Sequence, residues 1–253
     1  MIKTLTYTEN KIQMIEELKI PEDSEEVFDY KAIYNKCLID LSLDMLEPPT
    51  ALSIGSHSYK GNTYRNNTFT YGEFSAIVAG SKNKKTFFKS ALIAAFIGGE
   101  NNNYLPFGVE DLEPHEIILF IDGLFNDPRY KGRIKWLSID GVADLVLNEN
   151  DIIESKKVAK QLKKWRKENK CHINTVIHKN STSLKATGHL GSYVEKKAET
   201  VIVLEDTEDY KIRNSPIEVN QSYSRGAPFD TFYFKLNDDT LPYECGVSED
   251  WEV

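Results

Sequence analysis

A short basic segment has the residue types and spacing of a phosphate-binding loop. It reads Ala79-Gly80-Ser81-Lys82-Asn83-Lys84-Lys85-Thr86. A small residue is followed by four further positions, then by one more residue, and then by a lysine and a threonine. In such loops, backbone N–H groups at a helix N-terminus hold the phosphates of a nucleotide. We therefore expect Lys85 to contact the terminal phosphates and Thr86 to ligate Mg²⁺. The residues expected to line ATP are Gly80, Ser81, Lys82, Asn83, Lys84, Lys85, Thr86 and Phe87.

Lys84 departs from the usual pattern, because it stands where glycine is expected before the lysine. Glycine at this place relieves a backbone constraint and lets phosphate approach closely. The Lys84 side chain could either point away from the loop or add positive charge beside the phosphates. A basic surface turn before a core helix is the alternative interpretation of the whole segment.

Two further polar residues follow apolar strands and could complete a site. Asp140 ends the apolar run of residues 134–140, where a carboxylate can hold Mg²⁺. His178 ends residues 172–178 and could sense the terminal phosphate, so it is a candidate catalytic residue with Lys85. Asp144 follows on the next loop, and it could either cap a helix or belong to the site.

Alternating strands and helices must position these residues. The phosphate loop joins a buried strand at 74–79 to a helix at 86–96 that we expect to stop at Gly98-Gly99. Helical spacing of apolar residues predicts a helix at about 151–169. Other expected strands are 134–140, 172–178, 200–204 and 231–236. This alternation predicts an α/β fold with a mostly parallel central sheet flanked by helices and a short C-terminal β extension.

Length and composition limit the classes of protein that fit. The chain has 253 residues and a net charge of −8, which favours one α/β domain and disfavours a basic protein that merely coats DNA. We expect an acidic, partly helical leader at 1–50, with residues 51–70 as a loop or weak hairpin, and the main domain at 51–253. Three distant cysteines and the lack of a long apolar run predict a cytoplasmic protein with no membrane partner.

Two basic segments are candidates for binding DNA. Residues 179–192 are polar, glycine-containing and basic, and they read as a functional loop. Its candidate contacts to DNA phosphates or to a neighbouring subunit's nucleotide include Lys179, Lys185 and His189. The lysine-rich helix at 155–170 could also be a DNA patch, although such a charge run is more often a solvated face.

Five segments together resemble the RecA-like P-loop ATPases of the RepA/DnaB helicase group, and most of all the AAA-family ATPases of Bacteroidetes phages and mobile elements. They are AIVAGSKNKKTFFKSAL, IKWLSIDGVADLV, INTVIHKN, GHLGSYVEKKAETVIVL and SYSRGAPFDTFYFKLNDDTLP. The resemblance implies a RecA-like core, with Lys85 and Thr86 on ATP and Mg²⁺, Asp140 as the Walker B residue and His178 as the sensor. It makes Lys84 a family variant, and it implies subunit-interface contacts by Lys196, Lys197 and Arg225.

The catalytic glutamate of RecA-like ATPases has no evident counterpart. Residues 117–122 could be the strand that carries it. Alternatively, 114–125 could be the helix before the Walker B strand, with Pro114 at its first turn, and the glutamate strand would be missing. We favour the helix because EPHE resembles the start of that helix in relatives. Glu100, Glu110 and Glu113 are available as candidates for this glutamate.

The motifs and the resemblance together lead us to expect an oligomeric ATPase acting on DNA. The alternative is a nucleotide-binding module that hydrolyses little or no ATP. A metabolic P-loop kinase ranks last, because no arginine-rich lid is evident.

Overall fold

The computed structural model describes residues 29–38, 49–100, 108, 111–179, 186–207 and 215–246. The chain divides into two units, Met1–Leu46 and Glu47–Val253. In the first unit, helix α2 spans Tyr30–Cys37, and the Asp29 carboxylate caps it by accepting a hydrogen bond from the Ala32 amide at 3.0 Å. Apart from residues 49 and 50, the rest of the expected leader lies outside the described residues, and a domain boundary at residue 50 stays a prediction.

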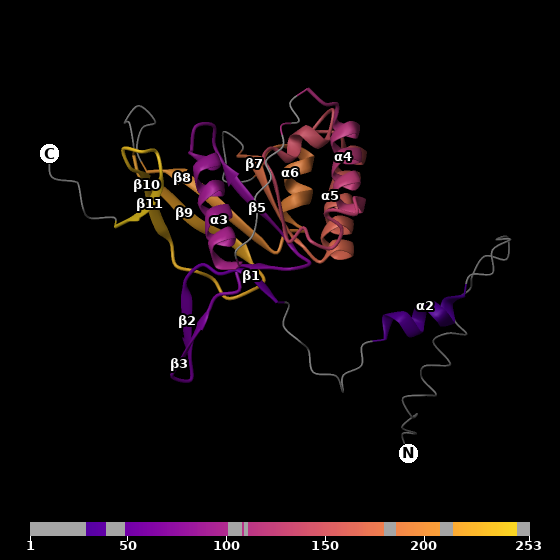
Figure 1. Cartoon of the computed structure of the whole chain (residues 1–253), viewed down its shortest axis with the longest axis horizontal. Helices are drawn as coiled ribbons and strands as arrows, with labels where there is room; N and C mark the ends of the chain where they lie inside the picture. The colour runs from indigo at the N-terminus through magenta and orange to yellow at the C-terminus, as the bar shows by residue number, and fades with distance from the viewer. Residues whose placement is uncertain are drawn as a thin grey trace, which may run out of the picture. The chain divides into compact units, whose positions relative to one another are not determined.

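The second unit is built on a seven-stranded sheet with the order β11-β10-β9-β8-β5-β7-β6 (Figure 1). Neighbouring strands β6, β7, β5 and β8 are parallel, and β9, β10 and β11 extend the sheet as an antiparallel ribbon. The bounds are β5 Phe74–Ala79, β6 Trp136–Ile139, β7 His172–His178, β8 Thr200–Asp206, β9 Ile217–Ser224, β10 Phe232–Leu236 and β11 Pro242–Cys245.

Helices cover both faces of this sheet (Figure 1). Helix α3, Lys85–Glu100, buries Phe88 and Leu92 against one face. Helices α4 (Pro114–Asn126), α5 (Ile152–Asn169) and α6 (Gly188–Glu195) pack on the other face around Trp165 and Leu162. The expected α/β class, with a central sheet between helices and a C-terminal β extension, is confirmed.

The local sequence explains why β5 and α4 form where they do. All six residues of β5 are buried, as expected for an apolar run covered by helices on both faces. Helix α4 begins at Pro114 with a capping box between Glu113 and Glu116. The helical interpretation of this segment is therefore confirmed, and the alternative strand at 117–122 is wrong.

Helix α3 continues beyond its expected end. We predicted a stop at Gly98-Gly99, but the helix reaches Glu100. A Cβ at either glycine would meet no atom within 4 Å, and neither glycine has the positive φ of a helix-ending glycine. The two glycines are therefore tolerated inside the last turn, at a cost of roughly 1 kcal/mol each relative to alanine.

Two small antiparallel pairs precede the sheet in sequence. Strand β1 (Thr50–Leu52) pairs with β4 (Phe69–Thr70), and β2 (Ser56–Tyr59) forms a hairpin with β3 (Asn62–Arg65). The hairpin that we considered for residues 51–70 is therefore confirmed, and it projects away from the sheet (Figure 1). Among the described residues, no helix combines the length and apolarity needed to cross a membrane.

Candidate functional site

The predicted phosphate loop lies at the carboxyl edge of the central sheet, the end where the parallel strands finish. Residues 80–84 join β5 to α3, and Ala79 is paired with His178 of β7 and with Leu204 of β8. The loop is followed by a helix on one face, whereas β7 leads to α6 on the other face. Ligands of open α/β sheets bind at such a divergence of connections.

Lys85, the first residue of α3, lies over the loop. Its ammonium group donates to the Gly80 carbonyl at 3.0 Å and lies 3.4 Å from the Ala79 carbonyl and 3.1 Å from His178 Nδ1. Because an ammonium group has no acceptor, the His178 Nδ1 atom must be the unprotonated acceptor of that contact. Partial burial lowers the pKa of Lys85, and the Asp140 carboxylate opposes part of that shift. The structure thus brings Lys85, His178 and Asp140 together.

Lys84 adopts a left-handed backbone conformation, with φ of 50°. This is the region that glycine enters freely and that costs other residues about 1–2 kcal/mol. Its side chain leaves the loop and donates to the Ser215 carbonyl at 2.7 Å. Partial burial lowers the pKa of Lys84, and Asp206 raises it in part. Of the two alternatives for Lys84, the structure therefore supports the side chain that points away.

Two further contacts fasten the loop region to the end of β8. The Asn83 side-chain amide donates to the Leu204 carbonyl at 3.1 Å, and Lys179 forms an ion pair with Glu205 at 2.7 Å. Asn83 and Lys84 thus hold the loop, and Lys179 joins the end of β7 to the end of β8. The remaining residues expected to line ATP, which include Ser81, Thr86 and Phe87, are exposed at the same edge.

Asp140 follows β6, but it has a partner that the sequence did not predict. The Lys89 ammonium, one turn after Lys85 on α3, lies 2.6 Å from its Oδ2 atom. The Lys89 side chain is 13% exposed and the Asp140 carboxylate 45% exposed. The ion pair fixes β6 against α3, and it leaves one side of the carboxylate open to solvent. The helical spacing of Lys85 and Lys89 could have suggested that both face the same edge.

The oxygen donors at this edge fit Mg²⁺ that arrives with a nucleotide. Among the described residues, no group of three or more His, Cys, Asp or Glu side chains could hold a metal ion by itself. Nucleotide-bound Mg²⁺ takes its other ligands from phosphates and water and needs one or two protein oxygens. The Thr86 hydroxyl and the Asp140 carboxylate are hard donors of that kind.

Asp144 also lies at this site, within the short 3₁₀ helix η1 (Val142–Leu145). Gly141 has φ of +92°, and a Cβ built there would lie 2.6 Å from Asp144 Oδ2, so the carboxylate packs directly against the residue after Asp140. Desolvation raises the pKa of Asp144, the charge of Asp140 raises it further, and His178 lowers it. Within the described part of the chain, no hydrogen bond involves this carboxylate, so Asp144 does not act as a cap.

Of the three glutamates that the sequence left available, the structure describes the side chain of Glu113 alone. Glu113 caps α4. Glu110 and the Glu100 side chain lie outside the described residues. Asp144 is an acidic residue that the structure places beside Asp140 and His178, and sequence analysis had left it undecided between two roles.

The predicted interface residues divide between two ends of the sheet. Lys179 and His189 lie at the carboxyl edge, but Lys179 is paired with Glu205. Lys196 and Lys197 lie four and three residues before β8, and Arg225 directly follows β9, so these three lie at the opposite edge. Lys185 lies outside the described residues.

The loop expected at 179–192 is partly helical, which corrects that prediction. Helix α6 begins at Gly188 and buries Leu190, which is 1% exposed. A Cβ at Gly191 would lie 2.6 Å from the Ala186 Cβ, and one at Gly188 would lie 2.9 Å from the Glu149 carbonyl. These glycines permit close packing of α6, and they are not marks of a loop.

Comparisons with known proteins add little to this geometry. No family model matches the chain, and no curated protein matches it. Among solved structures, the chain is similar to a KaiC-like protein from the hyperthermophilic archaeon Pyrococcus horikoshii OT3, with 15% sequence identity and a TM-score of 0.49. The match covers 69% of this chain and 91% of that chain. A function for this chain must therefore be inferred from its own site.

Proposed function

We propose that the chain is a RecA-like P-loop ATPase that binds ATP with Mg²⁺, hydrolyses it, and acts on DNA in the replication, mobilisation or recombination of a phage or mobile element. We further propose that it works as a homo-oligomer in the cytoplasm. The observation that carries the ATPase proposal is the position of Lys85, whose ammonium joins the carbonyls of the phosphate loop to His178, with Asp140 and Asp144 beside it.

Each side chain has a role that follows from its chemistry. Lys85 would exchange its loop carbonyls for phosphate oxygens, which attract an ammonium group more strongly than neutral carbonyls do. His178 would follow this change, because its Nδ1 atom contacts the same ammonium. Thr86 and Asp140 would hold Mg²⁺, which supplies charge neutralisation at the phosphates. Asp144 would orient and polarise the attacking water as a carboxylate base.

A phosphate-release assay tests this function. The full chain is incubated with ATP and Mg²⁺, with and without single-stranded DNA, beside Lys85→Ala and the control Lys157→Ala on the exposed face of α5. We expect release by the parent and the control, stimulation by DNA, and loss of release in Lys85→Ala. Release that survives Lys85→Ala unchanged would overturn the proposal.

The alternative function is a nucleotide-binding module with little or no hydrolysis. It is favoured by one observation: within the described residues, no glutamate side chain contacts Lys85, Asp140 or His178. It predicts that ATP binds to the parent chain and not to Lys85→Ala, while neither releases phosphate. Turnover in the range of about 1–100 s⁻¹, which is usual for phosphoryl-transfer enzymes, would exclude it.

A further inference from the structure

The amino edge of the central sheet, the end where its parallel strands begin, is one continuous surface. The backbone amide of His172 donates to the Lys135 carbonyl at 2.9 Å, which joins the starts of β7 and β6. The Glu199 amide donates to the Phe74 carbonyl at 2.8 Å, and the Arg225 amide donates to the Glu199 carbonyl at 3.0 Å. Residues far apart in sequence therefore share this edge because the sheet topology places them there.

Exposed cations are concentrated at this edge, although the whole chain has a net charge of −8. They come from the segments just before β6, β7 and β8 and just after β9. The side chains, all exposed, are Lys131, Arg133, Lys135, Lys170, Lys196, Lys197 and Arg225. A local concentration of positive charge of this kind attracts a polyanion, whatever the net charge of the chain.

Two acidic residues within this edge, Glu73 and Glu199, are engaged internally. Glu73 pairs with Arg166 at 2.7 Å and lies 3.6 Å from Arg225. Glu199 is 6% exposed and accepts hydrogen bonds from the backbone amide and the hydroxyl of Thr70. Neither carboxylate therefore offsets the exposed cations at the surface.

The C-terminal half of α5 continues this basic surface as an open groove of about 510 Å³. Helix α5 ends two residues before β7, so this half of the helix lies toward the amino edge. One carboxylate, Glu168, stands among the cations. The lining residues are Lys160, Lys163, Lys164, Arg166, Lys167 and Glu168.

The β2–β3 hairpin adds aromatic rings and further cations. All eight strand residues are exposed, and Tyr59 and Tyr64 are 58% and 46% exposed. The Lys60 ammonium lies 5.1 Å from the centre of the Tyr59 ring, and His57 stacks on Tyr64 at 5.8 Å. The sequence has no acidic residue between Glu47 and Glu73.

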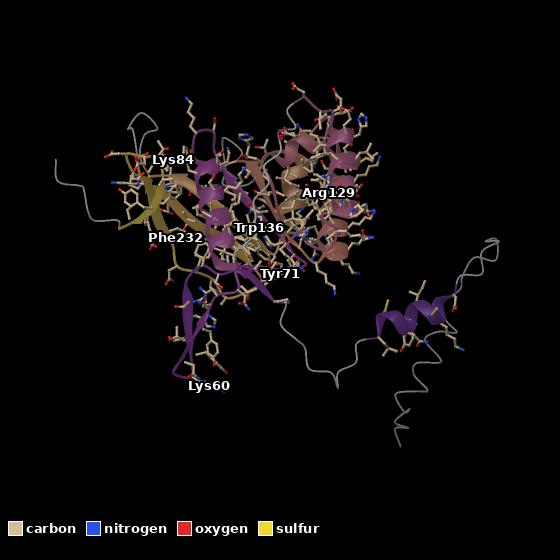
Figure 2. All side chains as sticks on the ribbon, in the orientation of Figure 1. Lys60, Tyr71, Lys84, Arg129, Trp136 and Phe232 are labelled. Carbon is tan, nitrogen blue, oxygen red and sulfur yellow. The ribbon has the colours of Figure 1, made fainter. Side chains whose placement is uncertain are left out.

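The base of this hairpin is fixed to the amino edge. The Asn66 side chain, 1% exposed, donates to the carbonyls of Ile54 and Pro228, and its Oδ1 atom lies 2.7 Å from His57 Nδ1. Pro228 lies three residues after Arg225, so the hairpin projects from the same end as the basic residues. Figure 2 shows Lys60 at the tip of the hairpin, at the opposite end of this unit from Lys84 of the phosphate loop.

We propose that the amino edge and the β2–β3 hairpin form one binding surface for single-stranded nucleic acid, an inference that rests on the proposed function for its nucleic-acid partner. The edge and the groove bind phosphates, and the exposed tyrosines stack on unpaired bases, as in other sequence-tolerant single-strand binders. The strands SHSY and NTYR contain no aliphatic side chain, so the ribbon suits bases and phosphates better than an apolar protein partner. A duplex keeps its bases stacked and cannot use the rings.

Binding to a fluorescently labelled oligo(dT), read as anisotropy for the full chain without ATP, tests this surface. The hairpin variant is Tyr59→Ala/Lys60→Ala and the edge variant is Lys131→Gln/Lys135→Gln. The matched control is Lys156→Gln/Lys157→Gln, which removes the same charge from the end of α5 near the carboxyl edge. None of the replaced side chains makes a hydrogen bond or an ion pair within the described residues. Lys60 lies over the Tyr59 ring within the hairpin, and Lys156 lies over the Tyr193 ring.

We expect the hairpin variant to bind about tenfold more weakly, because a stacked base is lost. The edge variant should bind more weakly and flatten the slope of log K against log salt by about 1.4, since each single-strand phosphate contact contributes about 0.7. The control should change affinity less than twofold. Circular dichroism of each variant checks its fold.

Three results would overturn the inference. The edge and hairpin variants could bind like the parent, the control could weaken binding as much as they do, or a duplex could bind as tightly as the single strand. Failure of the parent to bind any oligonucleotide would remove the nucleic-acid partner from the proposed function as well. The effect of Lys85→Ala on phosphate release remains a separate result that bears on the ATPase alone.

Discussion

At the scale of single residues, a measurement of ATP hydrolysis most directly tests the proposed role of Asp144. It is held against Gly141 beside Asp140, and no described group hydrogen-bonds to it. We expect Asp144→Asn to lower single-turnover phosphate release by about 100-fold, because an amide of the same shape cannot act as a base. ATP binding, measured by calorimetry, should stay within a few-fold of the parent value.

The matched control for this substitution is Asp140→Asn. Its carboxylate is the expected Mg²⁺ ligand, so we expect this variant to weaken Mg²⁺-dependent ATP binding as well as release. Equal turnover by Asp144→Asn and the parent would show that Asp144 does not act on the water.

Some residues of the site could be identified from sequence, and others depended on distant partners. Lys85 and Thr86 follow from a local pattern, and the strand-end positions of Asp140 and His178 follow from apolar runs. Lys84 could not be resolved between its alternatives, because the carbonyl that it reaches belongs to Ser215, far along the chain. Lys89 was missed for the same reason, since its partner Asp140 lies on another element.

At the scale of elements, His172 joins the start of β7 to β4 and β5, and this junction should be sensitive to acid. The His172 ring contacts the Thr70 carbonyl at 2.9 Å and the Ser75 hydroxyl at 2.8 Å while fully buried. Burial lowers the pKa of His172 to about 4 from 6.5. The unfolded chain therefore takes up a proton as the pH falls below about 6.5, whereas the folded chain does so near 4. Stability should fall by about 3 kcal/mol across that window.

Urea unfolding at several pH values measures this effect, with His172→Gln as the comparison. We expect this variant to be less stable than the parent at neutral pH, because the contacts of the His172 ring are changed. Because Gln does not titrate, the variant should also lose less stability between pH 6.5 and 4.

Glu199 has an effect of the opposite sign. Burial raises the pKa of Glu199, so its contribution to stability is lost as the pH rises above about 4.5. Because both proteins contain Glu199, subtracting the two curves isolates His172. Parallel curves would contradict the prediction.

The elements that sequence predicted best are those with the strongest apolar patterns. Strands β5 and β7 have the bounds that we expected, since nearly all of their residues are buried. Strand β9 was missed because buried and exposed residues alternate irregularly along it, and α6 was read as loop because of glycines that serve packing. The position of β7 between β5 and β6 depends on tertiary contacts, which the order of elements along the chain does not reveal.

At the scale of the whole molecule, the Glu47–Val253 unit presents two chemically different ends. The carboxyl edge carries the candidate nucleotide site, and the amino edge carries the basic surface and the hairpin. They are separated by the length of β5, whose six residues span about 20 Å at about 3.4 Å each. The net charge of −8 disfavoured a protein that merely coats DNA and left a local basic patch open, and the exposed cations of the amino edge are concentrated in such a patch.

This separation predicts how DNA should affect hydrolysis. Single-stranded DNA at a concentration below saturation should stimulate phosphate release by the parent and by Lys156→Gln/Lys157→Gln. Tyr59→Ala/Lys60→Ala should keep the parent's rate without DNA, because the hairpin lies far from Lys85, and should lose most of the stimulation because less DNA is bound. Raising the DNA concentration should restore the stimulated rate in this variant. If Tyr59→Ala/Lys60→Ala instead released phosphate more slowly than the parent without DNA, the substitutions would be affecting the fold or the nucleotide site. If this variant were fully stimulated at a low DNA concentration, the activating strand would bind elsewhere.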